Sequence, residues 1–248
     1  MSGLVALHGG GEYATGDEAA MDALLAAAVE AAGGATPRVV IVPTAVARHR
    51  PDLAVAHGER AFRAAAARAG AEVRVSSASL LRRADAEIPG AAVLAELAEA
   101  HLVHLPGGDP DLIPAVLRGT AGWAAILRAH AAGACVAGAS AGAMALAERL
   151  WTPHGPAEGL GLVPGIAVLP HFAPGRLNEW RATVDAAGNG GPGDAAALAW
   201  LGLDEQTLVI GRPGGRWTVA GRGRAYLAPP GASAVTRSAG PGESLLPG

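Results

Sequence analysis

The chain has 248 residues, 50% of them hydrophobic and 4% aromatic, so Ala, Val and Leu must build the core of one large α/β domain or two small ones. A formal net charge of −3 argues against nucleic acid or an anionic membrane as a partner. The single cysteine, Cys135, excludes an internal disulfide and a cysteine-rich metal site, and its apolar neighbours predict a buried strand residue.

Short apolar runs bounded by Gly and Pro predict the strands of a buried parallel sheet. Ala-rich segments separate these runs, which is the order expected of βαβ units. The predicted strands cover residues 4–7, 38–45, 71–77, 101–105, 134–139 and 165–172.

The segments between the strands have helical patterns. The first of them begins just after a Gly-rich turn, and more helix is expected after residue 172. The predicted helices cover residues 17–32, 52–69, 91–100, 111–117 and 121–132.

Gly-rich breaks every few residues are typical of an antiparallel hairpin or meander in residues 207–227. The tail after about residue 230 has little to pack and is expected to be loose. Because the chain has no repeat and no long linker, it predicts one domain, residues 1–248. The expected fold is three-layer α/β, a mostly parallel sheet flanked by helices, with a C-terminal antiparallel hairpin.

One stretch of small residues suggests a catalytic serine. Residues 136–144, VAGASAGAM, place Ser140 between Gly138 and Gly142, after a strand and before a helix, which is the pattern of a nucleophile elbow. Such a turn would expose the serine Oγ in a strained conformation, and the N–H of Ala141 would point toward an oxyanion. A Gly/Ala-rich turn needed only for close packing is the alternative.

A serine needs a base to act as a nucleophile. Among the eight histidines, His171 lies at the end of a predicted parallel strand, where ligands gather in open α/β sheets. His154, in a loop, is the rival candidate.

The turn PGGDPD follows the strand at 101–105. Its two glycines let the backbone approach a ligand closely, so the N–H of Gly108 or Asp109 could complete an oxyanion hole. An ordinary glycine turn between strand and helix would explain the same residues.

Two other motifs match known patterns only in part, one failing on order and spacing and the other on one required residue. HGGG at 8–11 with GASAG at 138–142 imitates an α/β-hydrolase esterase, but that fold has its oxyanion segment after the third strand and its histidine late, and no histidine follows His171. GEYATGDE at 11–18 has the glycine spacing of a phosphate loop but Asp17 where lysine is required.

The sequence instead resembles the family of cyanophycinase and dipeptidase E, serine peptidases with a class I glutamine-amidotransferase-like, flavodoxin-like fold. The matching motifs include GGGE, IVPTA, GGD and GASAGA, and they run in order over nearly the whole chain. The matching segments lie at 9–12, 41–45, 107–109, 138–143, 159–172, 202–210 and 217–227.

The resemblance implies that Ser140 is the nucleophile and His171 the base. It also implies an oxyanion hole near Gly108, Asp109 and Ala141.

Four acidic residues belong to the matching segments or lie beside them. Glu158 precedes GLGL much as the family's acid does, so it is the expected third member of a triad, against the alternative of a solvated loop carboxylate. Glu12, Asp204 and Glu205 are interpreted as structural positions that hydrogen-bond loops near the site.

Some positions depart from the family pattern. Pro170, after Leu169, stands where the family has an acid or amide before the histidine, and Glu179 stands where a further arginine is expected. Arg176 remains, and its guanidinium is expected to bind a substrate carboxylate. A cation on a helix surface is the alternative interpretation of Arg176.

We therefore expect a serine hydrolase, with no metal and no organic cofactor, that cleaves a small peptide or amide bond through an acyl-enzyme. The resemblance alone favours short peptides with an aspartyl residue. An esterase or amidase acting on a non-peptide, and a catalytically silent member that binds a small ligand, are the alternatives. The cytoplasm is the expected location because no signal-peptide pattern or membrane-length apolar run is evident. A homodimer is compatible with the sequence, which does not fix the oligomeric state.

Overall fold

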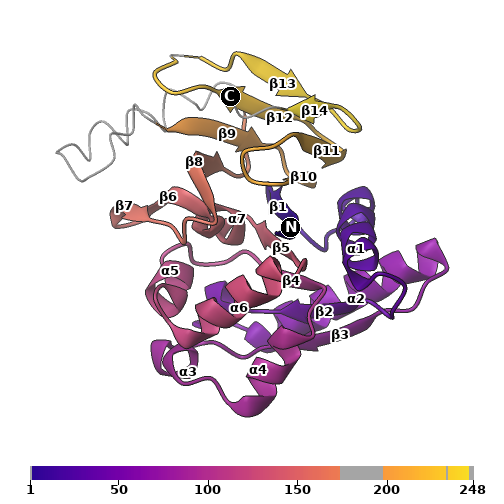
Figure 1. The fold of residues 1–248 in the computed structure, drawn as a ribbon. Coiled ribbons are helices and arrows are strands. Elements are labelled where there is room, and N and C mark those ends of the chain that lie inside the picture. Colours follow the sequence, from indigo (N-terminus) through magenta and orange to yellow (C-terminus); the bar gives the residue numbers. More distant parts are fainter. Residues whose placement is uncertain (1, 174–197, 233, 246–248) are drawn as a thin grey trace.

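Two mixed β-sheets organise the computed structural model, which describes residues 2–173, 198–232 and 234–245 (Figure 1). The larger sheet has eight strands, of which the five from β1 to β3 in spatial order are parallel, while the other three are antiparallel. In spatial order the strands are β14 (Ser244–Leu245), β11 (Trp217–Gly221), β10 (Thr207–Gly211), β1 (Val5–His8), β5 (Cys135–Ala139), β4 (Leu102–Leu105), β2 (Arg38–Ile41) and β3 (Arg74–Ser77).

The second sheet has six strands; its later ones are orange to yellow in Figure 1 and its earlier ones, which precede residue 173, are salmon. Its central pairs, β6 with β8 and β8 with β9, are parallel, and the outer pairs are antiparallel. In spatial order the strands are β13 (Arg237–Ala239), β12 (Ala225–Ala228), β9 (Ala199–Leu203), β8 (Val163–Leu169), β6 (Ala147–Thr152) and β7 (Gly155–Glu158).

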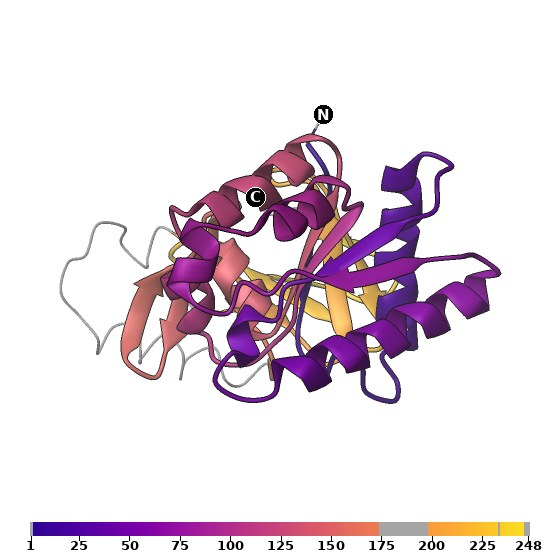
Figure 2. The ribbon, with the colours of Figure 1, turned by 90° about the horizontal axis from the view of Figure 1, so that it is seen from below.

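Two long helices, α1 (Glu18–Ala32) and α2 (Pro51–Ala69), cover one face of the larger sheet (Figure 2). Their buried side chains include Leu24 and Phe62, which share a core cluster with Leu102 of the sheet. This layer is built mostly from Ala and Leu, as the low aromatic content requires.

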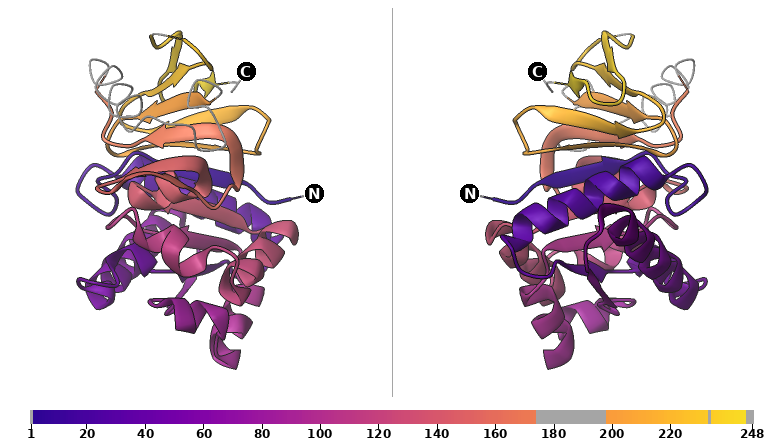
Figure 3. Two further views of the ribbon diagram at one scale, coloured as in Figure 1. Left: turned by 90° about the vertical axis from the view of Figure 1, so that its left-hand side faces the viewer. Right: turned by 90° about the vertical axis from the view of Figure 1, so that its right-hand side faces the viewer.

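The opposite face of the larger sheet carries shorter helices and, further along, the second sheet (Figures 2 and 3). One buried cluster joins Leu105 and Val136 of the larger sheet to Val168 and Leu201 of the smaller one, which favours the single-domain prediction. The helices on this side are α3 (Arg83–Glu87), α4 (Ala91–Ala98), α5 (Leu112–Leu117), α6 (Ala121–Ala131) and α7 (Ala141–Leu146).

The predicted α/β class is confirmed, and each strand and helix predicted within the described residues has a counterpart close to its expected place. The helix expected after residue 172 lies largely outside the described residues. The sequence did not predict α3, β6, β7 or β9 as separate elements. Residues 147–150 have good helix formers, but they pair with β7 and β8, so tertiary contacts override their helical preference.

The C-terminal residues differ from expectation. The tail after about residue 230 was expected to pack little, yet β13 pairs with β12 and β14 pairs with β11. Leu245 is buried against the core, which gives this short strand an apolar anchor.

A buried polar cluster lies between α2 and the larger sheet. His104 of β4 is almost fully buried, its Nδ1 accepts a 2.6 Å hydrogen bond from the Tyr13 hydroxyl, and its ring lies edge-on to Phe62. Burial raises the pKa of Tyr13 well above its usual value, so the hydroxyl keeps its proton. Burial, with repulsion from His8, lowers the pKa of His104 to about 3.

This shift predicts acid sensitivity. Between the ordinary pKa of 6.5 and the folded value near 3, the unfolded chain binds a proton at His104 that the folded chain does not bind. The free energy of unfolding should therefore decrease as the pH is lowered through this window, by about 1.4 kcal/mol per pH unit from this group. Urea unfolding at several pH values between 7.5 and 4.5 measures it.

The His104→Phe variant is the control for this prediction. It removes the titrating group and leaves the Tyr13 hydroxyl without its acceptor, so it should be less stable at neutral pH by about 1–3 kcal/mol. Its stability should nevertheless depend less steeply on pH. Equal pH slopes for the two proteins would contradict the assignment.

Candidate active site

Ser140 lies in a strained turn between β5 and α7. Its φ and ψ are +47° and −111°, a conformation that L-residues rarely adopt. A Cβ at Gly138 would lie 2.4 Å from the carbonyl carbon of Gly142, and one at Gly142 would lie 2.1 Å from the oxygen of Leu105. Both flanking glycines are therefore required by close backbone packing, and the turn has the form of a nucleophile elbow.

His171 follows β8 and faces the serine. Its Nε2 lies 3.0 Å from Ser140 Oγ, and its own φ is +50°. The N–H of His171 donates to the oxygen of Gly9 at 2.7 Å. Gly10 lies against the imidazole, because a Cβ there would be 2.2 Å from its Cε1.

Glu205 accepts the other hydrogen bond of the imidazole. Its Oε1 lies 2.8 Å from His171 Nδ1, and it is in the turn between β9 and β10. A carboxylate can only accept, so Nδ1 carries the hydrogen and Nε2 presents a lone pair to the Ser140 hydroxyl. Ser140, His171 and Glu205 thus form a connected chain of hydrogen bonds.

The structure corrects the position expected for the acid. Glu158 is exposed at the end of β7 and forms an ion pair with Arg118, so it does not hold His171. The rival base, His154, lies in the exposed turn between β6 and β7, whereas His171 occupies the place beside Ser140.

Two backbone N–H groups are free to act beside Ser140. Those of Gly108 and Ala141 make no hydrogen bond within the described residues, and both residues line the same cavity as Ser140. The N–H of Asp109 instead donates to the oxygen of Ala45 at 2.8 Å, in the 3₁₀ helix η1 (Thr44–Val46). Asp109, one of the two expected donors, is therefore excluded, and Gly108 remains.

Glu12 fixes the strand-end turn that carries Gly108. Its Oε1 accepts the N–H of Gly107 at 2.7 Å. A Cβ at Gly107 would lie 3.1 Å from Ser140 Cβ, so this peptide passes directly beside Ser140. The interpretation of Glu12 as a residue that holds a loop near the site agrees with this contact.

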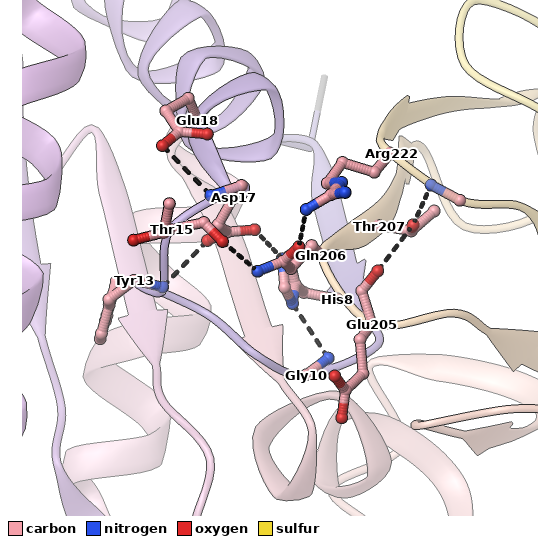
Figure 4. A network of polar contacts seen from close by, with 12 residues as sticks. His8, Gly10, Tyr13, Thr15, Asp17, Glu18, Glu205, Gln206, Thr207 and Arg222 are labelled. Atoms are coloured by element: carbon pink, nitrogen blue, oxygen red, sulfur yellow. Dashed lines mark hydrogen bonds and ion pairs between the residues drawn. The ribbon is translucent and has the colours of Figure 1, made fainter.

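The loop that contains Glu12 is closed by a buried pair (Figure 4). His8 Nε2 donates to Asp17 Oδ1 at 2.8 Å, and both side chains are almost completely buried. The second ring nitrogen of His8 accepts the N–H of Gly10, and Asp17 Oδ2 accepts the N–H of Tyr13. Residues 9–17 are thus tied to the end of β1 at both ends.

The same loop also holds the residue after Glu205 (Figure 4). The N–H of Gln206 donates to the oxygen of Gly10 at 2.7 Å, and its side-chain amide donates to the oxygen of Thr15 at 2.8 Å. Asp204, on the other side of Glu205, accepts the N–H of Arg224. These contacts set the direction of the Glu205 side chain.

A cavity of about 370 Å³ opens at the serine, and its lining includes Ser140, His171, Gly108 and Ala141. Pro170, at the position where the sequence departs from the family pattern, also lines it. Arg176, the expected carboxylate-binding residue, lies outside the described residues.

The described residues give less support to a cysteine nucleophile, a metal centre or a membrane span. Cys135 is buried as expected, and burial raises the pKa of its thiol to about 12, which makes it a poor nucleophile. Within the ranges that the structure describes, no three His, Cys, Asp or Glu side chains are grouped to hold a metal ion. No helix in those ranges is both long and apolar enough to cross a bilayer.

Comparisons with known proteins agree with this geometry. Residues 5–196 match Peptidase family S51. A crystal structure of a peptidase from an acI-B1 Actinobacterium is 26% identical and has a TM-score of 0.77, over 99% of this chain and 97% of that one. A candidate peptidase E protein from Listeria monocytogenes EGD-e is 15% identical, with a TM-score of 0.57 over 88% and 98%, and supports the fold alone. No curated protein sequence gave a significant match.

The contact between Glu12 and Gly107 predicts how the Glu12→Ala variant reacts with a fluorophosphonate probe. Without the carboxylate, the peptide before Gly108 loses its anchor, so labelling of Ser140 should slow by roughly tenfold to a hundredfold. Labelling rates, measured by mass spectrometry, test this. The Glu12→Gln variant keeps an acceptor oxygen and should label almost as fast as wild type, and equal slowing of both variants would rule out this role.

Proposed function

Because this chain belongs to Peptidase family S51, a family of serine peptidases, we propose that Ser140, His171 and Glu205 act as a triad that hydrolyses a bond in a small peptide. The observation that carries the proposal is the chain of two short contacts, 3.0 Å from Ser140 to His171 and 2.8 Å from His171 to Glu205. The strained serine and the free N–H groups beside it support the same chemistry.

In the first half of the reaction, Ser140 Oγ bonds to the peptide carbonyl carbon while its proton passes to His171 Nε2. The N–H groups of Gly108 and Ala141 donate to the oxyanion of the tetrahedral intermediate. The imidazolium then gives its proton to the amine nitrogen as the C–N bond breaks, which leaves an acyl-enzyme.

Water completes the cycle. It attacks the acyl carbon as His171 Nε2 takes one of its protons, and collapse of the second tetrahedral intermediate returns that proton to Ser140 Oγ and releases the acid. Glu205 accepts the hydrogen bond from Nδ1 throughout, so that Nε2 is always the nitrogen that faces the serine. The mechanism assigns no step to a cofactor.

Two alternatives to a peptidase that the sequence left open differ from it in properties that can be measured. An esterase or amidase would use the same triad on a non-peptide, and a silent binding protein would have the cavity without a reactive serine. The preference for aspartyl peptides, which the family resemblance implies, and the carboxylate-binding role of Arg176 stay predictions, as do the cytoplasmic location and the homodimer.

Fluorophosphonate labelling tests the triad without knowledge of the substrate. Wild type should be labelled at Ser140, and Ser140→Ala should not be labelled. His171→Ala should be slower by several orders of magnitude, because the serine loses its base. A folded wild type that is never labelled would favour the silent binding protein.

The acid has a matched control in this chain, because Glu205 and Glu158 are both surface glutamates paired with a basic side chain. Glu205→Ala should slow labelling about a hundredfold or more, since the imidazole loses the group that fixes its tautomer. Glu158→Ala should label at the wild-type rate. The reverse order would return the role of the acid to Glu158.

A further inference from the structure

We infer that the cavity beside Ser140 accepts an apolar side chain, so that the preferred substrates have a residue such as Leu or Phe on the acyl side of the cleaved bond. This inference rests on the proposed function, because it assumes that Ser140 attacks the carbonyl of the residue that fills the cavity. It differs from the aspartyl preference that the family resemblance implies.

The described wall of the cavity is apolar. Met144 lies one helical turn after Ser140 on α7, so its side chain stands on the same side of the helix as the nucleophile. Trp151 of β6 forms the neighbouring part of the wall, and the prolines at 110, 153 and 170 complete it. Met144 and Trp151 belong to one buried cluster with Trp200, whose ring centroid lies 4.9 Å from that of Trp151.

The polar atoms of this wall are already engaged or hidden. The Thr152 hydroxyl donates to the oxygen of Gly155 and accepts the N–H of His154, so its own turn uses it. Trp151 Nε1 is buried and has no acceptor in the described part of the chain. Among the described lining residues, the remaining polar side chains are those of Ser140 and His171.

The basic side chains on the Pro110 side of the cavity are engaged by carboxylates of the chain itself. Asp109 lies 3.3 Å from His49 Nε2 and 3.7 Å from Arg48 Nη1, and Asp111 accepts a hydrogen bond from the same Arg48 nitrogen. Arg48 and His49 therefore both face carboxylates of the chain itself. A substrate carboxylate that entered the cavity would lose its water without gaining a free cation among these residues.

The volume also suits one apolar side chain and its backbone. About 370 Å³ lies near the lower end of the roughly 300–1,000 Å³ typical of small-ligand sites. An apolar substrate side chain would move from water to the apolar wall of the cavity, and this transfer favours binding.

Three dipeptides of nearly equal size test the inference: Leu-Ala, Asn-Ala and Asp-Ala. Leu, Asn and Asp differ in polarity and charge more than in shape, so kcat/KM compares the chemistry of the first side chain. Wild type should cleave Leu-Ala with a kcat/KM at least about tenfold above that of Asp-Ala, with Asn-Ala between them.

Variants of the wall should move this ratio in stated directions. Pro153 is exposed at the edge of the cavity, so Pro153→Lys adds a cation and should improve Asp-Ala relative to Leu-Ala by about tenfold, whereas the neutral Pro153→Gln should not. Met144→Ala should lower kcat/KM for Leu-Ala relative to Ala-Ala, and Met144→Leu, of similar volume, should preserve the ratio.

Labelling of Ser140 separates this inference from the proposed function. If wild type is labelled but cleaves Asp-Ala as fast as Leu-Ala or faster, or cleaves none of the three dipeptides, the apolar preference is overturned while the reactive serine stands. If Ser140 is never labelled in the folded protein, the triad itself is refuted. A Leu preference that does not respond to Pro153→Lys or Met144→Ala would overturn the assignment to this wall.

Discussion

The buried hydrogen bond between His8 and Asp17 is the constraint on which the candidate active site depends. It closes the loop of residues 9–17, and that loop then contacts His171, the residue after Glu205 and the turn before Gly108. Gly9 and Gly10 hold the backbone and the ring of His171, Gly10 also holds the residue after Glu205, and Glu12 holds the turn before Gly108. Because these contacts are mostly to backbone groups, the loop can position the catalytic groups only if its own path is fixed.

Backbone strain is concentrated where this network is densest. Ser140 and His171 both have positive φ, a conformation that non-glycine residues adopt only when their surroundings impose it. At Ser140 the packing of Gly138 and Gly142 imposes it, and at His171 the hydrogen bond to Gly9 and the close contact with Gly10 do so. The strain points the two side chains at each other across the end of the larger sheet, at a separation that suits proton transfer.

The sequence predicted the parts of the site that depend on local structure. Ser140 is identified by a short pattern of strand, turn and helix, and His171 by its place at the end of an apolar strand. Glu205 has no such local signal, because its partner lies 34 residues away and the two meet only when β9 and β10 are in place. Asp109 fails as a donor for a similar reason: the direction of its N–H depends on Ala45, in the distant η1. The second sheet was missed because residues 147–150 form strand through their partners and not through their own preference.

The origin of the three proposed catalytic residues links the activity to the assembly of both sheets. Ser140 follows β5 of the larger sheet, His171 follows β8 of the smaller one, and Glu205 lies where the chain passes from β9 in the smaller sheet to β10 in the larger. Neither sheet alone holds the hydrogen-bonded chain, and the buried cluster shared by Leu105, Val136, Val168 and Leu201 is what fixes one sheet against the other. The Glu205 carboxylate is well exposed, so its pairing with His171 adds little stability of its own. The core shared by the two sheets must therefore fix the relative positions of Glu205 and His171, because their exposed contact is too weak to do so.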